Sequence, residues 1–535
     1  MRFFFSFFLL LLLLHCNAQV FDITTYGAVG NGTTLNTTAI QAAIDACHAA
    51  GGGTVEVPSG NFLTGTLILK SNVNFHISQG GTITGSTNIN HYPVLNPQKR
   101  TYTDNYPQRS VFYAEGQHNI AVTGEGTFHG NGQSVAFLLD QANRPYGFRF
   151  FSCSNVRYEG LTLRHSGFWM MHNFDIDTLV IKNLNIVNHG FGNNDGVNID
   201  CSRKVLVDSI FADCNDDPMV IKTSSLLSSE DIEIKNCTVA TYSRALKIGT
   251  ETNGAVKNVH LHDCVVQLST LGPLNNKASC GINLSIVDGG SMENVLVENV
   301  TMTGINTPFF IRLGNRARKY TDTAATQGVG YVRNIELKSI TATASNNITS
   351  SVTGIPNYYA KNIALKNIDV TFPGGYPVSN GLTVPEKENG KPDADMFGDT
   401  LPAAGLYIRH VDSVRLENVC FHPQQYDQRP TLYFDDVLNA DTTGVCLETS
   451  MLNHTAEKFK IYPNPLLHQT LQFEKEEGET VKVIINNFSG KVFLETIVSE
   501  THTAFDVTHL PKGIYLFTVT GKRITTSKKF VKLGD

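Results

Sequence analysis

A short apolar pattern recurs through most of this chain, and it restricts the possible folds more than any other feature of the sequence. A unit begins with a Val, Ile or Leu flanked by Asn or Asp, and further apolar residues follow two, five and seven places later. Ile232, for example, is followed by Ile234, Cys237 and Val239. Most steps are about 23 to 28 residues long, as in a repeat architecture, and the units begin at Val156, Leu179, Val205, Ile232, Val259, Val295, Ile335, Ile363 and Val414.

This spacing predicts two short strands joined by a bend in each unit. One turn of a parallel β-helix has about this length and contains three strands, whereas a propeller blade needs longer repeats linked by hairpins. We therefore expect an all-β chain that coils as a parallel β-helix, with the starting residues stacked in ladders inside it. The array is expected to run from about His118, with Ile120 starting an early rung, and to fade after Val437.

Two kinds of segment interrupt the strands. Apolar residues recur at helical spacing between residues 39 and 47 and three glycines follow, so we expect one helix that caps an end of the strand stack. The insertions after Val259 and Val295, and residues 376–396, predict loops. Loops on a rigid scaffold usually carry specificity, so these segments are expected to form the walls of a binding groove.

The two ends of the chain differ from the array. Residues 1–18 predict a secretory signal peptide, with Arg2 as its positive end, an apolar run and a small-residue cleavage site. The run is too short for a transmembrane anchor, His15 before Cys16 is a poor fit to a lipoprotein, and no other stretch is expected to span a membrane. Residues 19–447 are assigned to the β-helix. Residues 455–535 are richer in Lys and Glu and predict a small C-terminal β-sandwich.

The charge balance of the chain excludes two classes of partner. The 42 basic and 48 acidic residues give a net charge of −6, so neither nucleic acid nor a membrane surface is expected as a partner.

The cysteines do not predict a disulfide framework. Signal cleavage would remove one of the 10 cysteines, and the odd number left cannot all pair. Cys237 and Cys264 hold equivalent places in two repeats and are interpreted as small core residues. No CxxC pair predicts a zinc site.

Three aspartates are the strongest chemical signal. Aligning the strands on their apolar residues places Asp195, Asp217 and Arg244 at equivalent positions of consecutive repeats, with Asp216 one step before Asp217. Equivalent residues of stacked parallel strands lie about 4.8 Å apart, so the carboxyls crowd one patch and at least one pKa should rise. Hydrolysis of a glycosidic bond needs such a proton donor beside a base, and an inverting enzyme needs carboxyls about 6.5–9.5 Å apart to admit water.

Two other interpretations of the aspartates stay open at this point. Asp-Asp and Asn-Asp pairs often only cap turns, and carboxylates also bind Ca²⁺, as in a lyase. The sequence has no EF-hand loop, and we expect a site without a metal or another cofactor.

Basic residues near the aspartates are candidates for substrate binding. Arg244 and Lys247 are placed to bind an anionic sugar carboxylate, and charge balance for the aspartates is the alternative. Arg312 alternates outward along its strand and is expected to line the groove. Lys222 is a weaker candidate, for which a solvated face serves equally well. Trp169 and His172 suggest a sugar-stacking platform, although partial burial at the edge of a rung explains them better.

Several of these motifs resemble glycoside hydrolase family 28, the polygalacturonase family of pectin-degrading enzymes. The resemblance covers about residues 21–437 and is carried by YGAVGNG, by GGGTVEVPSGNFLTGTLILKSNV, and by NNDG and NDD in place of the family's Asn-Thr-Asp and Asp-Asp blocks. It implies a right-handed parallel β-helix and inverting hydrolysis without a metal. It also implies that Asp216 is the general acid and that Asp195 and Asp217 activate water.

Two motifs of that family are replaced in this chain. Its Gly-His-Gly aligns with Ser243-Arg244-Ala245, and its Arg-Ile-Lys, which holds galacturonate at the cleavage point, aligns with Asn283-Leu284-Ser285. Asn283 is therefore a further substrate-binding candidate. Arg244 and Lys247 are expected to take over from the missing basic residues, or the substrate differs: a rhamnogalacturonan, an exo-cleaved galacturonide, or another plant-wall or algal polysaccharide.

The tail resembles the C-terminal sorting domain of type IX secretion cargo through YPNP, GIYLFTV and KKFVKL. This implies that the type IX secretion machinery is a partner and that the protein is secreted or held at the cell surface. The chain is thus interpreted as a secreted, monomeric glycoside hydrolase of pectin-type polysaccharide. A glycan-binding β-helix without catalytic activity and a polysaccharide lyase are the alternatives.

Overall fold

The computed structural model describes residues 19–139, 143–271, 280–376, 383–398, 400–446, 459–467, 469–475, 480–487, 491–520 and 525–533. The expected signal peptide and the expected domain boundary lie outside the described residues. Within these ranges, no helix combines the length and the apolar character that crossing a membrane requires.

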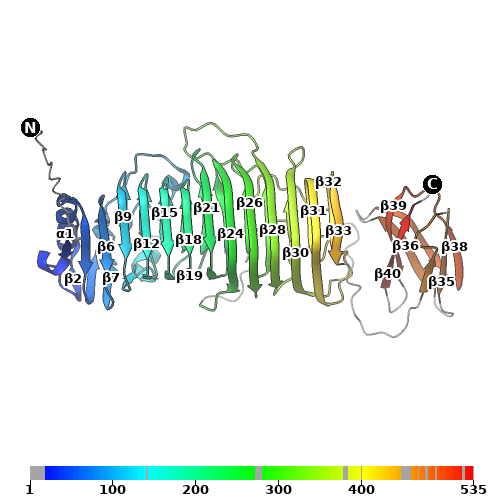
Figure 1. Ribbon diagram of the computed structural model, residues 1–535, viewed down its shortest axis with the longest axis horizontal. Helices are drawn as coiled ribbons and strands as arrows, with labels where there is room; N and C mark the ends of the chain where they lie inside the picture. The colour runs from blue at the N-terminus through cyan, green and yellow to red at the C-terminus, as the bar shows by residue number, and fades with distance from the viewer. Residues whose placement is uncertain are drawn as a thin grey trace, which may run out of the picture.

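Parallel strands coil into an elongated right-handed β-helix (Figure 1). The repeat spacing predicts the parallel coil, and the family resemblance implies its hand. Each full turn adds one strand to each of three parallel sheets. The first sheet contains β5 (Leu67–Ile68), β8 (Ser110–Glu115), β11 (Tyr146–Phe151), β14 (Met171–Phe174), β17 (Val197–Asp200), β20 (Met219–Thr223), β23 (Arg244–Thr252), β25 (Cys280–Ile286), β27 (Thr307–Leu313), β29 (Ser350–Thr353), the start of β31 (Leu406–Gln425) and β32 (Leu432–Val437).

The second and third sheets form the remaining faces of the coil. The second contains β1 (Val20–Asp22), β3 (Gly53–Val57), β6 (Val73–Ile77), β9 (His118–Thr123), β12 (Ser154–Glu159), β15 (Asp177–Lys182), β18 (Arg203–Asp208) and β21 (Ser229–Lys235). The third contains β2 (Asn31–Leu35), β4 (Gly60–Thr64), β7 (Gly81–Gly85), β10 (Thr127–His129), β13 (Thr162–Arg164), β16 (Asn185–Asn188), β19 (Phe211–Cys214) and β22 (Thr238–Thr241).

In the later turns the second and third sheets share long, bent strands. These are β24 (Ala255–Leu268), β26 (Ser291–Thr303), β28 (Tyr331–Thr343), β30 (Ala360–Gly374) and β31, which β33 (Ala440–Cys446) follows.

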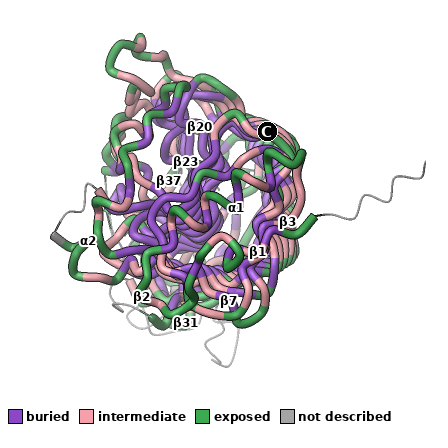
Figure 2. The backbone as a smooth tube through the Cα atoms, turned by 90° about the vertical axis from the view of Figure 1, so that its left-hand side faces the viewer, coloured by how far each residue is buried: buried purple, intermediate pink, exposed green. Residues whose placement is uncertain are grey.

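The predicted interior ladder is confirmed residue by residue. The unit-starting residues pair in sequence from Ile120 through Val156 and Leu179 to Val414. These residues are at most 3 % exposed and belong to one apolar core inside the coil. Figure 2 shows the backbone of the coil end-on, coloured by burial. Burial of such continuous apolar ladders is the main favourable term that holds the turns together.

The ends of the array differ from the prediction. The coil begins at β1, which pairs with β3, so the repeats start long before His118. Here the apolar pattern is obscured by the helix α1 (Thr37–Ala49), which buries Ile40, Ala43 and Ile44 at the end of the coil, as expected of a cap. At the other end β33 extends the array beyond Val437. Short helices α2 (Val135–Leu139), η1 (Ile23–Tyr26), η2 (Ile89–His91) and η3 (Tyr102–Asn105) lie between strands.

The C-terminal part is a separate small β-sandwich, as predicted (Figure 1). Its two antiparallel sheets enclose their own apolar core around Phe473, Ile485 and Phe517. One sheet contains β34 (Phe459–Tyr462), β35 (Thr470–Lys475) and β38 (His502–Asp506). The other contains β36 (Val481–Asn487), β37 (Val492–Val498), β39 (Gly513–Thr520) and β40 (Thr525–Lys532).

Candidate active site

The predicted aspartates converge at the start of neighbouring strands of the first sheet. Asp195 precedes β17, and Asp216 and Asp217 precede β20, while Arg244 opens β23. The register that the sequence predicted holds: Val197 pairs with Met219, and Met219 pairs with Leu246. Because parallel strands keep equivalent residues side by side, the turn that enters each strand delivers its carboxyl to the same place.

The three carboxyls lie close together. One oxygen from each of Asp195, Asp216 and Asp217 lies within 4.8 Å of the other two. The reason is that the side chains turn inward to a common point, where Ser243 donates from its hydroxyl to Asp216 at 2.7 Å and to Asp217 at 3.3 Å.

Basic side chains neutralise part of this charge. Lys247 donates to Asp217 over 2.5 Å, and both side chains are 5 % exposed. Arg244 lies 3.8 Å from Asp216, donates to the Ser243 hydroxyl at 2.7 Å and contacts Asp393. Charge balance for the aspartates, which the sequence left open beside a substrate role, is thus what the described contacts of Arg244 and Lys247 provide.

The three carboxyls have different protonation tendencies. Burial raises the pKa of Asp195 well above its ordinary value, and Asp216 and Asp217 add to the effect. Burial and the neighbouring Asp217 also raise the pKa of Asp216. Burial acts in the same direction on Asp217, but Lys247, Arg244 and Lys222 outweigh it and hold its pKa below the ordinary value. The cluster therefore combines one carboxyl of lowered pKa with two of raised pKa, and acid–base catalysis uses groups whose pKa values are separated in this way.

A second ion-pair network borders the cluster. Lys222 is 3 % exposed, donates to Glu251 at 2.7 Å and lies 4.5 Å from the centre of the Trp169 ring, so a solvated position for Lys222 is wrong. Glu251 also accepts from Tyr106 at 2.8 Å and from Arg318 at 3.0 Å. These pairs fix Lys222 beside the aspartates, where its charge contributes to the low pKa of Asp217.

The aromatic residues near the cluster are buried. Trp169 is 3 % exposed and packs with Tyr146 and Phe168, while His172 is fully buried and bonds to Asp200 at 3.0 Å. The sugar-stacking alternative is therefore not supported, and burial, which the sequence favoured, is complete rather than partial.

A segment at residues 383–398, part of the predicted 376–396 loop, covers the outward face of the sheet beyond the cluster. Phe310 and Tyr407 of the sheet form an apolar cluster with this segment, which contributes Val384, Ala394, Met396 and Phe397. Asn283 donates to the Pro392 carbonyl at 3.2 Å, and the Arg312 guanidinium donates to the Glu386 and Lys387 carbonyls at 3.2 Å each.

Arg312 therefore does not line the groove as predicted: the residue is 1% exposed, and its guanidinium holds the covering segment. Asn283 is fully buried and also tethers this segment rather than facing an open groove. Both are correctly placed on outward strand positions. A segment distant in the chain folds over them, and the repeat spacing does not predict that contact.

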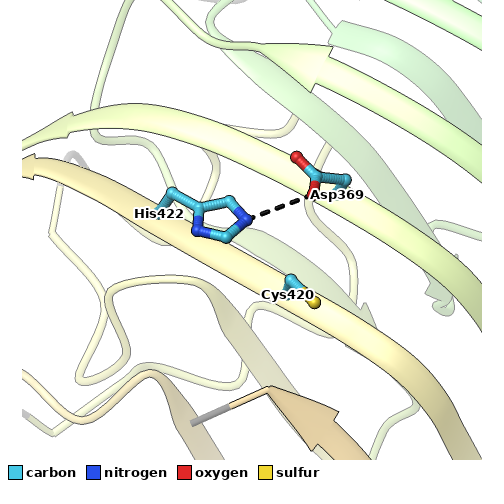
Figure 3. A group of neighbouring side chains, drawn as sticks. All are labelled: Asp369, Cys420 and His422. Atoms are coloured by element: carbon cyan, nitrogen blue, oxygen red, sulfur yellow. Dashed lines mark hydrogen bonds and ion pairs between the residues drawn. The ribbon is translucent and has the colours of Figure 1, made fainter. Parts of the chain in front are cut away.

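A second cluster with possible metal ligands lies at the far end of the coil. Figure 3 shows Asp369, Cys420 and His422 side by side on β30 and β31. Cys420 is disulfide-bonded to Cys446, so its sulfur is not a free thiolate, and His422 instead pairs with Asp369 at 3.2 Å. Cys237 and Cys264 are free and buried, as predicted.

The aspartate cluster also has the donor atoms of a cation site. Lys247, Arg244 and Lys222 already place three positive charges beside it, and these oppose the binding of a hard cation such as Ca²⁺. The electrostatic environment thus favours proton transfer over calcium binding.

The sequence-based prediction did not include three candidate residues of the site: Ser243, Lys391 and Asp393. Lys391 lies 2.9 Å from Asp393, which in turn contacts Arg244. Ser243 could have been found from its place one residue before Arg244 in the aligned ladder. Lys391 and Asp393 lie in an irregular segment without repeat spacing, so no pattern connects them with the aspartates.

Comparison with known proteins finds a matching family model for each of the two parts of the chain. The model of glycosyl hydrolases family 28 matches residues 47–388, and that of the secretion system C-terminal sorting domain matches residues 460–533. A probable polygalacturonase of Vitis vinifera is 23% identical over 383 residues, which cover 66% of this chain and 75% of the relative. An exo-poly-alpha-D-galacturonosidase of Dickeya chrysanthemi is 41% identical over 122 residues, 21% of this chain and 20% of the relative.

Solved structures share the fold. The exopolygalacturonase of Thermotoga maritima superposes with a TM-score of 0.56 at 22% identity, covering 76% of this chain and 92% of that one. The family 28 exopolygalacturonase of Yersinia enterocolitica gives 0.60 at 19% identity, covering 80% and 79%. The sorting domain shows that the protein is exported to the cell surface or beyond.

Proposed function

This chain belongs to family 28 of the glycosyl hydrolases, and from this membership we propose that it cleaves galacturonate-containing, pectin-type polysaccharide by inverting acid–base hydrolysis. The coarser statement, a secreted glycoside hydrolase, rests on the family and on the sorting domain. The observation that carries the finer proposal is the convergence of three carboxyls with unequal pKa values at the start of β17 and β20.

In the proposed mechanism Asp216 is the general acid. Its raised pKa keeps a proton available for the leaving glycosidic oxygen. Its side chain is 25% exposed, compared with 5% for Asp217, so it is the better placed of the two to reach a substrate.

Asp217 is the proposed base. Lys247 keeps it ionised, so it accepts a proton from the attacking water. Asp195 orients the same water, since carboxylate oxygens within 4.8 Å of one another can share one water molecule as a hydrogen-bond partner. Its high pKa favours this positioning role over that of the principal base.

The substrate class follows from the relatives and the charge of the site. Both relatives and both solved structures described above are named for galacturonate polymers. Arg244, Lys247 and Lys222 surround the aspartates with positive charge, which favours an anionic sugar. Arg244 and Lys247 remain our candidates for contact with the substrate.

The Asp216→Asn variant tests this assignment. Loss of the proton donor should lower kcat on a responsive glycan by at least about 100-fold, while binding of the glycan persists. Turnover is followed through new reducing ends and binding through calorimetry. Unchanged turnover would remove Asp216 from the mechanism.

The stereochemistry is tested on the wild-type protein. Proton magnetic resonance of the first product should show the anomer opposite to that of the cleaved bond. Release of the retained anomer would exclude the inverting mechanism while leaving glycoside hydrolysis intact.

A further inference from the structure

A short acidic and basic pair approaches the aspartate cluster from outside the family match. Lys391 and Asp393 belong to the segment at residues 383–398, and the family model ends at residue 388. Asp393 bridges two cations, because one of its oxygens contacts Arg244 and the other lies 2.9 Å from the Lys391 ammonium. Arg244 in turn lies 3.8 Å from Asp216.

The backbone on both sides of this pair is held in place. Asn283 of the first sheet binds the Pro392 carbonyl, between the two residues of the pair, at 3.2 Å. Asn315 donates its backbone N–H to the Glu388 carbonyl at 2.7 Å. The Arg312 guanidinium carbon lies 5.4 Å from the centre of the Phe397 ring. The pair is therefore part of the rigid surroundings of the site.

Lys391 differs from the other cations near the aspartates in the hydrogen-bonding capacity that its ammonium retains. The side chains of Lys222 and Lys247 are 4% and 5% exposed and are committed to Glu251 and Asp217. The side chain of Lys391 is 63% exposed, and the one partner described for its ammonium is Asp393. An ammonium has three donors, so it has capacity for an additional anionic partner.

Arg244 provides a second donor without a described partner. It is 7% exposed, and its Nε is buried without a hydrogen-bond partner among the residues that the structure describes. The electrostatic field of the site reaches Lys391 as well: burial lowers its pKa, Arg244 and Lys247 add to that effect, and Asp216 and Asp217 oppose it. The contacts that run from Lys391 through Asp393 and Arg244 to Asp216 place Lys391 at the border of the cluster, where it can contact a bound sugar.

We propose that Lys391 binds the carboxylate of the uronate at the cleavage point and determines the preference for an acidic over an esterified substrate, with Asp393 as the residue that positions Lys391 against Arg244. This inference rests on the proposed function. It explains how a site whose strand β25 carries Asn283 and Ser285 at its outward positions, and no basic residue, holds an anionic sugar. The cation comes from the covering segment.

Binding in the Asp216→Asn background tests the proposal without requiring turnover. The probes are a galacturonate oligosaccharide and its methyl ester, titrated by calorimetry. Replacing Lys391 by Ala should raise Kd for the acid about tenfold, the low end for a hydrogen bond to a charged group, and leave Kd for the ester unchanged. Lys391→Arg, which keeps the charge, should restore most of the affinity.

Two further variants separate positioning from general damage. Asp393→Asn should weaken binding of the acid less than Lys391→Ala does, and it should also spare the ester. Lys361→Ala removes an exposed lysine that lies 4.0 Å from Asp412 on the second sheet, and it should change neither Kd.

An equal loss for acid and ester in Lys391→Ala, or no loss for either, would overturn the proposal. Tighter binding of the acid in Asp393→Asn would show that Asp393 competes with the substrate, which contradicts its positioning role. Failure of the proposed function is visible separately, since the wild-type protein would then release no reducing ends from the same oligosaccharide.

Discussion

The three aspartates of this site differ in pKa because their neighbouring side chains differ. Lys247 contacts Asp217 directly and lowers its pKa, whereas burial and the neighbouring aspartates raise the pKa values of Asp195 and Asp216. In the proposed mechanism, Lys247 therefore determines which carboxyl serves as the base.

Replacing Lys247 by Met should shift the pH profile of kcat/KM. Lys247 lowers the pKa of Asp217, so its loss raises that pKa, and the acidic limb should move to higher pH by about 1–3 units. Lys247 also lowers the pKa of Asp216, so the alkaline limb, where the acid loses its proton, should move in the same direction. An acidic limb that stays in place or moves to lower pH would refute Asp217 as the base.

At this scale the sequence predicted part of the site. Asp195, Asp216, Asp217 and Arg244 could be placed together because the register of the ladder fixes equivalent residues side by side. The direction of the Arg312 side chain was also correct, but its partners come from a segment about 75 residues away, which obeys no repeat. Contacts of this kind depend on tertiary folding that spacing does not encode.

The elements owe their regularity to asparagines and aspartates at the bends. Asn236, between β21 and β22, has a φ of 55°, and Asn258, Asn294 and Asn334 take the same left-handed conformation. Their side-chain amides also bond from one turn to the next, Asn294 to Asn258 and Asn334 to Asn294, at 3.1 Å each. This explains why Asn or Asp flanks the start of so many units.

Asn294→Ala should destabilise the coil. An L-residue in the left-handed region costs about 1–2 kcal/mol, and the ladder hydrogen bonds contribute about 1 kcal/mol. Asn294→Gly is the matched control, because glycine accepts the conformation and loses only the hydrogen bonds. Urea unfolding should rank the wild type above Gly and Gly above Ala. Equal stability of the three proteins would contradict a structural role for the ladder.

The elements were more predictable than their limits. The strand pairs from Ile120 to Val414 follow from apolar spacing alone, since each interior residue must meet another of its kind. The assignment of residues 19–447 to the β-helix includes the first turns, but their repeat units were not recognised because α1 and the glycine-rich turns interrupt the pattern there.

On the scale of the whole molecule, access to the site is restricted. The outward ladder of the first sheet is buried from Arg149 and His172 on one side of the aspartates to Phe310 and Tyr407 on the other. Residues 92–109 cover the first side, where Gln108 binds Arg149 at 2.8 Å, and residues 383–398 cover the second. Under the proposed function, a polymer would meet the three aspartates over a short stretch, and we expect cleavage near chain ends.

The C-terminal sandwich has its own apolar core and a distinct role in export. None of its residues takes part in the described aspartate cluster. Catalysis and secretion are thus assigned to separate parts of the chain, and the monomeric state remains a prediction.

The most direct test of the account is to incubate the mature protein with polygalacturonate, rhamnogalacturonan and other wall glycans, and to follow reducing ends, unsaturated-uronate absorbance and product size together. We predict saturated mono- or disaccharide products from a galacturonate polymer, with no absorbance change. Unsaturated products would identify a lyase, and the absence of products from every glycan would indicate a binding protein; either result would contradict hydrolysis by the three aspartates.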